Sequence, residues 1–312
     1  MTRIVSSIPI LGRIWDCFSS IPRIRFVLDQ LKLVWMYKSL RPSRIWLSRA
    51  DSYLFVDAVE PRGRRVLLAG GRGQPMLKNI WKRAINELEP QVVIDVGVNY
   101  GEFLFAERYP SAERVIGIEA NADLAPFLER SRNEHKDKSK IELHYALASN
   151  ASNEKRQFFV DESSSGRSSV ICRDSTTCRE LEIRTVAIDD LIADLCIPCE
   201  TLVFKIDVEG FEPQVLLGMV STLRKYRNIF GIIEFNEQLI DQAGSDPEQF
   251  LRMLAQTFSL WSIPHHAPIQ RMKSANLLQL RQYSGTAIAE LDIVVASADL
   301  EPFGNKLFGT RT

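Results

Sequence analysis

The sequence lacks several features that would place it in large classes of protein. No apolar run approaches the roughly 18 residues that a membrane-spanning helix requires, so contact with a bilayer would be interfacial. We find no signal peptide, and the five cysteines are an odd number, so we expect a protein of the reducing cytoplasm. The 39 basic and 39 acidic residues balance. A neutral chain with an acidic catalytic half does not favour a nucleic acid partner.

The cysteines do not form a convincing metal or redox site. Cys196 and Cys199 have CxxC spacing, but they lie in the loop before a predicted strand, whereas a redox CxxC opens a helix. A zinc site needs a second pair, and Cys172 and Cys178 are too loosely spaced to supply it. We therefore expect inert loop thiols.

The amino-terminal part is basic. Residues 1–50 contain nine Lys or Arg and two Asp, a net charge of +7 that leaves −7 for the rest of the chain. Residues 24–40 have apolar side chains at helical spacing with basic residues between them, which predicts an amphipathic basic helix. We favour packing of this helix on the catalytic core or on a second subunit in a homodimer, and peripheral contact with the cytoplasmic face of a membrane is the alternative.

A hairpin and a helix are predicted next. Residues 53–59 and 64–69 flank Glu60-Pro61-Arg62-Gly63, which is typical of a β-hairpin with a Pro and Gly turn. Residues 76–88 repeat apolar side chains at helical spacing, and Pro90 follows. We therefore divide the chain into an extension over residues 1–75, a main domain over 76–300, and a frayed tail over 301–312.

The stretch from residue 91 to 121 organises the chain. Residues 92–96 are a short apolar run with β-branched residues and end at Gly97, which is typical of a strand buried in a parallel sheet. No helix breaker follows Gly101 until Pro110, so we expect a helix there, and residues 114–119 repeat the buried-strand pattern. The stretch predicts a β-α-β unit.

The turn of this unit suggests a nucleotide-like ligand. Gly97 and Gly101 are spaced G-x-x-x-G, whereas a dinucleotide fingerprint is G-x-G-x-x-G, and Glu102 would repel a pyrophosphate. S-adenosylmethionine carries no phosphate and fits better. Glu119 lies 22 residues after Gly97, where a carboxylate can accept hydrogen bonds from both ribose hydroxyls. A β-α turn with a capping Asn and no ligand is the alternative.

The residues that we assign to the cofactor gather at the ends of three predicted strands. Asp95 would orient the glycine loop or meet the ligand ammonium. The small residues after the third strand, residues 141–148, leave room for an adenine ring. The complete set is Asp95, Gly97, Asn99, Tyr100, Gly101, Glu119, Ala120, Asn121, Ala146 and Leu147.

A second chemical signal lies further along the chain. In the predicted strand 202–209, Lys205, Asp207 and Glu209 alternate onto one face, and a helix over 212–226 follows. The next strand, 229–236, ends with Glu234 and Asn236 on a common face. Because ligands bind at the carboxyl edge of parallel sheets, we expect these side chains to converge in an active site.

The remaining segments complete the sheet and its surroundings. Residues 157–161 and 182–188 predict two strands around the polar loop 163–169, which we interpret as a substrate lid. Residues 289–296 predict an edge strand. His265 or His266 is a weak acid or base candidate, since adjacent histidines point to different sides.

Six segments in this order resemble the FkbM family of S-adenosylmethionine-dependent methyltransferases: DVGVNYGEF, GIEAN, HYALAS, RTVAIDDL, KIDVEGFEPQVLLG and IIEFN. They cover residues 92–236, and the family usually has Ala where Val98 stands. The resemblance implies an α/β, Rossmann-like seven-stranded methyltransferase fold with a mostly parallel sheet and an antiparallel last strand. It also implies methyl transfer to a hydroxyl of a sugar or of a secondary metabolite.

The mechanism stays open between two arrangements. Asp207 is our first choice of general base, since methyl transfer needs positioning and one base. Alternatively, Asp207, Glu234 and Asn236 hold Mg²⁺, which lowers the pKa of the acceptor hydroxyl, although Lys205 could pair with these carboxylates instead. The other functions that we weigh are a nucleic acid or protein methyltransferase, a nicotinamide oxidoreductase and a non-catalytic membrane-adjacent scaffold.

Overall fold

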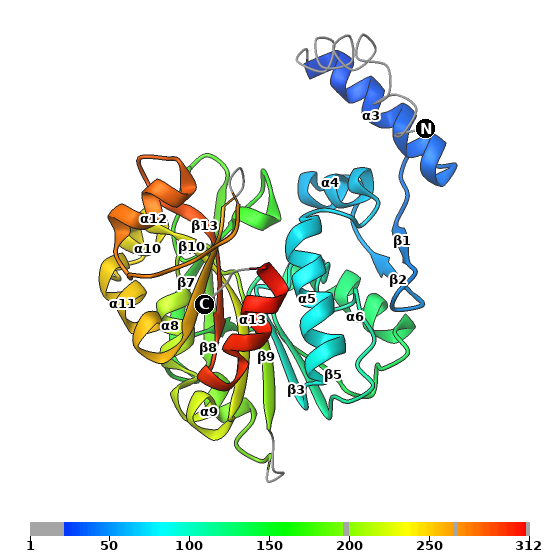
Figure 1. Cartoon of the computed structure of the whole chain (residues 1–312). Coiled ribbons are helices and arrows are strands. Elements are labelled where there is room, and N and C mark those ends of the chain that lie inside the picture. Colours follow the sequence, from blue (N-terminus) through cyan, green and yellow to red (C-terminus); the bar gives the residue numbers. More distant parts are fainter. Residues whose placement is uncertain (1–21, 196–199, 265–267, 310–312) are drawn as a thin grey trace.

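A large mixed sheet forms the centre of the molecule. The computed structural model describes residues 22–195, 200–264 and 268–309 (Figure 1). The strands follow the order β12-β11-β13-β10-β9-β3-β4-β5. Their bounds in chain order are β3 (Val92–Val96), β4 (Arg114–Ile118), β5 (Ile141–His144), β9 (Thr201–Ile206), β10 (Asn228–Asn236), β11 (Ser259–Ile263), β12 (Gln270–Arg271) and β13 (Glu290–Ala296).

This sheet confirms the predicted Rossmann-like class. Strands β5, β4, β3, β9 and β10 run parallel to one another, and β13 is antiparallel to both β10 and β11. The two-residue β12 adds an eighth strand beyond the seven that were expected. The prediction of β13 as an edge strand was wrong, because six of its seven residues are buried and it pairs on both sides.

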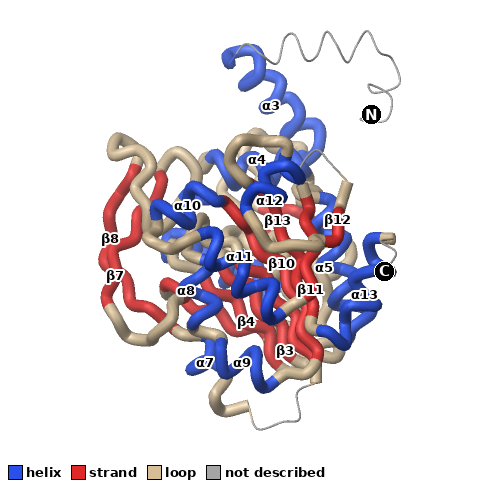
Figure 2. The backbone as a smooth tube through the Cα atoms, turned by 60° about the vertical axis from the view of Figure 1, so that its left-hand side comes forward, coloured by secondary structure: helices blue, strands red, loops and turns tan. Residues whose placement is uncertain are grey.

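Helices cover both faces of the sheet and enclose one hydrophobic core on each (Figure 2). One core includes side chains of α4 (Pro61–Ala69), α5 (Pro75–Leu88), α6 (Ala125–Glu134) and α13 (Glu301–Phe308). The other includes side chains of α7 (Ile188–Leu191), α8 (Glu212–Leu217), α9 (Val220–Lys225), α10 (Glu237–Gln242), α11 (Pro247–Thr257) and α12 (Leu277–Ser284). Strand β3 contributes Val93 to the first core and Ile94 to the second, as alternation along a strand requires.

The predicted hairpin around Pro61 was wrong. The hairpin is formed earlier, by β1 (Arg44–Leu47) and β2 (Ser52–Phe55), and residues 61–69 are helix α4. Glu60 caps this helix, because its carboxylate accepts a hydrogen bond from the Gly63 N–H at 2.6 Å, and Pro61 occupies the first helical turn. The acidic cap followed by Pro therefore starts a helix here and does not make a turn between two strands.

The amphipathic amino-terminal helix is confirmed as α3 (Pro22–Tyr37). Its contact with the body is limited. Leu33 is fully buried, and the Tyr37 hydroxyl donates a hydrogen bond to the Leu67 carbonyl of α4 at 2.7 Å. The rest of the helix stands away from the sheet (Figure 1). None of the described helices has both the length and the apolar composition needed to span a bilayer.

The helix that we expected after β3 does not form. Residues 99–107 make a series of turns, and Asn99 and Gly101 adopt positive φ angles of 51° and 86°. Phe103, Leu104 and Phe105 are consecutive and all at most 5% exposed. An amphipathic surface helix buries one face only, so three consecutive buried side chains do not fit such a helix.

The predicted helix over 212–226 is divided in two. Helix α8 ends before Gly218, and α9 begins at Val220. A Cβ at Gly218 would lie 2.0 Å from the Ser149 carbonyl oxygen. The interruption therefore coincides with a close approach of two backbones.

The tail was predicted as frayed, and this was wrong for residues 301–308. They form α13, in which Phe303 packs on Phe230 at a ring distance of 5.4 Å, and Gly304 lies against Trp261. The two strands predicted around a polar loop are confirmed as β7 (Lys155–Asp161) and β8 (Cys178–Val186), which form a small sheet with β6 (Leu147–Ala148).

Candidate active site

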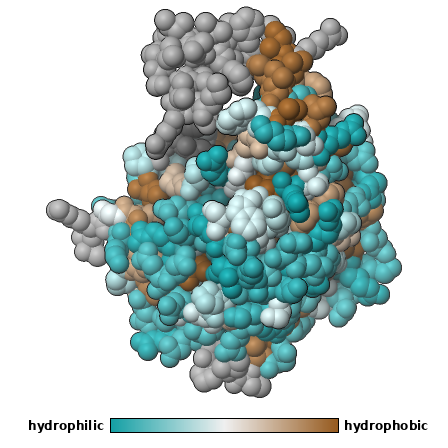
Figure 3. Space-filling model, turned by 90° about the vertical axis from the view of Figure 1, so that its right-hand side faces the viewer, coloured by the Kyte–Doolittle hydropathy of each residue, from teal (hydrophilic) through white to brown (hydrophobic). Residues whose placement is uncertain are grey.

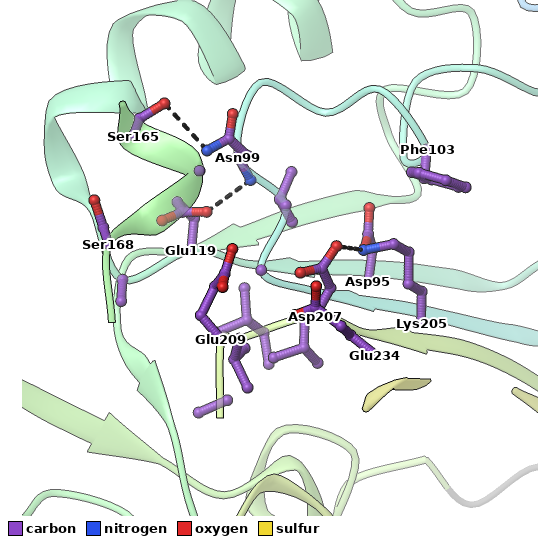
Figure 4. A pocket seen from close by; sticks show the side chains of 18 of the residues that line it. Asp95, Asn99, Phe103, Glu119, Ser165, Ser168, Lys205, Asp207, Glu209 and Glu234 are labelled. Carbon is purple, nitrogen blue, oxygen red and sulfur yellow. Dashed lines mark hydrogen bonds and ion pairs between the residues drawn. The ribbon is translucent and has the colours of Figure 1, made fainter. Parts of the chain in front are cut away.

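A cavity of about 300 Å³ lies at the carboxyl ends of β3, β4, β9 and β10. This is the edge of a parallel sheet where ligands bind in doubly wound folds. Figure 4 shows the polar side chains that point into it from these strands and from the loop 163–169. Ten lining residues are charged: Arg62, Arg65, Asp95, Glu102, Glu119, Arg167, Lys205, Asp207, Glu209 and Glu234.

Gly97 brings two strand ends into contact. Its φ is 79°, and a Cβ there would lie 1.8 Å from the Asp207 carbonyl oxygen. The Asp207 N–H donates to the Val96 carbonyl at 3.0 Å. Glycine is required at this position because both the left-handed backbone and the close approach exclude a side chain. The cofactor turn and the candidate base therefore share one packed junction.

Glu119 follows β4 and faces the cavity. One of its oxygens accepts a hydrogen bond from the Asn99 N–H at 2.7 Å (Figure 4), and the other accepts one from the Asn121 N–H at 2.8 Å. Burial raises the pKa of Glu119 to about 7, although both N–H groups oppose the shift. Each oxygen keeps a second lone pair, so the carboxylate can still accept a hydrogen bond from a diol.

Asp95 and Lys205 are buried cavity residues on the neighbouring strands β3 and β9, where they are register partners. Burial raises the pKa of Asp95 to about 6, and Lys205 partly offsets this. The Asp95 Oδ1 is buried without a hydrogen-bond partner in the described part of the chain. An orphaned acceptor of this kind fits a ligand that carries a donor group.

Lys205 holds Asp207 in its ionised form. The Lys205 Nζ lies 2.7 Å from Asp207 Oδ2, and its side chain is 4% exposed. Burial favours neutral Lys205, but Asp207 and Asp95 outweigh it and raise its pKa. Burial likewise favours protonated Asp207, but Lys205 outweighs it and keeps the pKa of Asp207 below the usual value.

Three carboxylates converge, as the sequence predicted. One oxygen each of Asp207, Glu209 and Glu234 lies within 4.8 Å of the other two. Burial and the neighbouring Asp207 raise the pKa of Glu209, and the same two causes raise that of Glu234 well above its usual value. The pKa shifts in this cluster therefore run in opposite directions: that of Asp207 is lowered, and those of Glu209 and Glu234 are raised.

The residues that could hold Mg²⁺ differ from the expected Asp207, Glu234 and Asn236. The Asn236 Oδ1 caps α10 by accepting from the Leu239 N–H at 3.1 Å, so this amide has a structural role, and Glu209 takes the third position. Hard carboxylate oxygens suit Mg²⁺. However, Lys205 already neutralises Asp207, and Arg173 forms an ion pair with Glu209. The cluster therefore has its own cations, and the residues present do not require a metal.

The polar loop 163–169 lies over the cavity. Its 3₁₀ turn η2 (Ser165–Arg167) is held by two contacts. The Asn99 amide donates to Ser165 Oγ at 3.2 Å, and the Ser165 N–H donates to Glu60 at 2.8 Å. The predicted place of the loop is confirmed, and its action as a moving lid stays a prediction.

Most of the predicted cofactor residues line the cavity, including Ala120, Ala146 and Leu147. Three of them do not. Tyr100 is 1% exposed with its ring against Phe127, Gly101 forms the turn, and the Asn121 side chain caps the 3₁₀ turn η1 (Ala122–Leu124). These three shape the loop around the site without facing it.

Sequence reasoning missed the contribution of the amino-terminal segment. Arg62 and Arg65 of α4, together with Gln74, line the cavity. Arg62 and Lys78 both form ion pairs with Glu102. Glu102 therefore does not present a free charge, and the argument that it repels a pyrophosphate was wrong. Recognising Glu60 and Pro61 as a helix start would have brought these arginines to the site.

Some predictions lie outside the described residues. His265 and His266 belong to the segment 265–267, and Cys196 and Cys199 to the segment 196–199. Cys172 and Cys178 are described and carry free thiols.

The family model of the methyltransferase FkbM domain matches residues 95–260, just over half of the 312 residues. The match runs from the strand that carries Asp95, through the strands with Asp207 and Glu234, to β11. It confirms the resemblance inferred from residues 92–236. No curated protein sequence matches the chain.

Among solved structures, the chain is similar to an O-methyltransferase from Bacillus cereus in complex with SAH. The identity is 12% over 72% of this chain and 82% of that one, with a TM-score of 0.38. It is also similar to the O-methyltransferase TomG from Streptomyces achromogenes, involved in tomaymycin synthesis, in complex with SAM. The identity is 12% over 72% and 80% of the two chains, with a TM-score of 0.37.

Proposed function

Because the chain belongs to the FkbM family of S-adenosylmethionine-dependent methyltransferases, we propose that it methylates a hydroxyl oxygen of a carbohydrate or of a secondary metabolite. The observation that carries the choice of oxygen is the ionised Asp207 on the cavity wall. A hydroxyl must lose its proton as the new C–O bond forms, and a carboxylate held ionised by Lys205 can accept it.

The cavity fits the cofactor. When bound, S-adenosylmethionine supplies a methyl group activated by a positively charged sulfonium. Glu119 would bind the ribose hydroxyls, the orphaned Asp95 Oδ1 would accept from the ammonium group, and the small Ala146 leaves room for the adenine.

The acceptor that suits the remaining wall is polar. Asn99, Ser165 and Ser168 line the cavity, whereas Phe103 and Phe158 are the only aromatic lining residues among those that the structure describes. Hydroxyl-rich molecules such as sugars can use these donors and acceptors.

The first test of this function is binding of SAH. We expect wild-type protein to bind SAH and not NAD in calorimetric titrations. Replacing Glu119 with glutamine should weaken SAH binding roughly 10- to 100-fold, since a hydrogen bond to a charged group contributes about 1.5–3 kcal/mol. Glu182→Gln changes an exposed carboxylate of β8 and should leave the affinity unchanged. Equal SAH affinity in Glu119→Gln and wild type would refute the assignment.

The same titration has an expected pH dependence. The ribose hydroxyls donate hydrogen bonds, so they bind the ionised carboxylate of Glu119, whose pKa burial raises to about 7. SAH affinity should therefore rise roughly tenfold between pH 6 and pH 8 as this group loses its proton. Most of that rise should disappear in Glu119→Gln. An affinity that falls with pH would contradict the role of Glu119.

Removal of divalent ions tests the alternative mechanism. Because Lys205 and Arg173 neutralise two of the three clustered carboxylates, we expect turnover to survive exhaustive chelation with EDTA. Added Mg²⁺ should not raise the rate. A large loss of activity after chelation, restored by Mg²⁺, would show that Asp207, Glu209 and Glu234 bind a catalytic ion.

A further inference from the structure

Exposed apolar side chains are concentrated in one part of the described chain. Of the twelve large apolar side chains that are exposed, eight lie between residues 26 and 59. Five of them belong to α3: Phe26, Val27, Leu31, Val34 and Trp35. In Figure 3, hydrophobic atoms gather at the top of the molecule, where Figure 1 places α3. Contiguous exposed apolar patches of this kind mark an interaction site.

The apolar residues of α3 form a face that points away from the body. Leu33 is fully buried on the side of α4, whereas Val27, Leu31 and Val34 recur at helical spacing and are 38–61% exposed. Trp35 extends the same face at 55% exposure. An amphipathic helix that covers the protein with one stripe only has a second stripe free for a partner.

The surroundings of this face are positively charged. Between residues 24 and 49 there are six Lys or Arg and one acidic residue, Asp29. A groove of about 690 Å³ between α3, α4 and the loop 163–169 is lined by Asp29 and by five basic residues: Arg25, Lys32, Arg64, Arg65 and Arg167.

Most of these charges have no ionic partner. In the described part of the chain, Arg167 pairs with Asp161, and the other four basic residues of the groove form no ion pair with a carboxylate. Arg64 lies over the ring of Phe26, and its Nη2 is buried without a hydrogen-bond partner among the described residues. The groove therefore offers uncompensated cations and unused donors beside an apolar face.

We propose that α3 docks this protein on the surface of an anionic phospholipid bilayer. Apolar side chains including Trp and Phe, next to Lys and Arg, are the composition of helices that lie in the membrane interface. Basic residues near such a surface gain about 1 kcal/mol each from anionic lipids. A second copy of this chain fits less well, because two-fold pairing of α3 would bring the same basic groove residues together.

The docking also restricts the acceptor, and this part of the inference rests on the proposed function. Arg65 and Arg167 line both the basic groove and the active-site cavity, so the groove adjoins the mouth of the site. Docking through α3 would bring this mouth close to the lipid headgroups. The acceptor hydroxyl would then belong to a molecule held in or at the bilayer, with an anionic group that Arg65 can bind.

Vesicle sedimentation of the full-length protein tests the docking without any turnover. We expect binding to vesicles of phosphatidylcholine with about 30% phosphatidylglycerol, weaker binding to phosphatidylcholine alone, and release at high salt. Leu31→Glu should reduce the bound fraction about tenfold, since it places a charge in the apolar face. Leu278→Glu is the matched control, because Leu278 is 67% exposed on α12 and Leu31 is 61% exposed on α3.

The outcomes separate this proposal from the function. SAH affinity should be the same in both variants, which shows that each is folded. The docking is wrong if the wild type ignores anionic vesicles or if Leu31→Glu binds them as wild type does. A wild-type dimer in light scattering that Leu31→Glu dissociates, without vesicle binding, would instead assign the face to a second copy. Failure of SAH binding in the wild type would leave the vesicle result intact and refute only the proposed function.

Discussion

Replacing Asp207 with asparagine should lower kcat by about 10²- to 10⁴-fold, the range typical of a lost general base. Asparagine is close to isosteric, but it cannot accept the hydroxyl proton. Because no hydrogen bond joins Asp207 to Glu119, the residue assigned to the ribose, in the described part of the chain, the SAH dissociation constant should stay within about threefold of wild type. Single-turnover kinetics with a screened acceptor, together with an SAH titration, measures the two quantities separately.

Lys205→Met provides the complementary variant. Lys205 is 3% exposed and acts through Asp207, so we regard it as a positioning residue. Without its charge the pKa of Asp207 should rise, and the acid limb of the pH profile of kcat should move to higher pH.

An Asp207→Asn enzyme that keeps more than a tenth of the wild-type kcat would exclude Asp207 as the base. Glu209, beside it in the cluster, would then be the next candidate.

The strands and their chemical ends could be predicted because the signals are local. Val92–Val96 and Thr201–Ile206 are apolar runs that end in Asp-Val-Gly and Lys-Ile-Asp-Val-Glu-Gly sequences. Parallel pairing of β3 with β9 then brings those ends to one edge. Convergence of Asp95, Lys205 and Asp207 follows from that register, without knowledge of any distant contact.

The parts that could not be predicted depend on contacts between distant segments. Ser165 is held at the site partly by Glu60, 105 residues earlier, which accepts a hydrogen bond from its backbone N–H. Arg62 enters the cavity because α4 packs there through Val66 and Leu67. The capping role of Asn236 was hidden because a polar residue at a strand end suits a helix cap and a metal ligand equally well.

Among glycine-to-alanine substitutions in the cofactor turn, Gly97→Ala should cause the largest loss of stability. The left-handed backbone alone costs an alanine about 1–2 kcal/mol. At Gly97 the added Cβ would also lie 1.8 Å from the Asp207 carbonyl oxygen, so one of the two strand ends must move. We expect the free energy of unfolding to fall by more than about 4 kcal/mol, a loss that few point mutations reach.

Gly244→Ala separates the two contributions. Gly244 has a φ of 85°, close to the 79° of Gly97, but no atom lies within 4 Å of its added Cβ. Gly244→Ala should therefore lose only the part of the free energy of unfolding that the left-handed backbone costs, as measured by urea denaturation. It should bind SAH as the wild type does. Gly97→Ala should unfold at much lower urea and, where it folds, bind SAH at least tenfold more weakly, since the shift displaces the junction that holds Asp207 beside the turn. If the two variants lose equal stability, the close packing of Gly97 on Asp207 does not contribute to the stability of the site. The inference that the cofactor turn and the base share one packed junction would then be wrong.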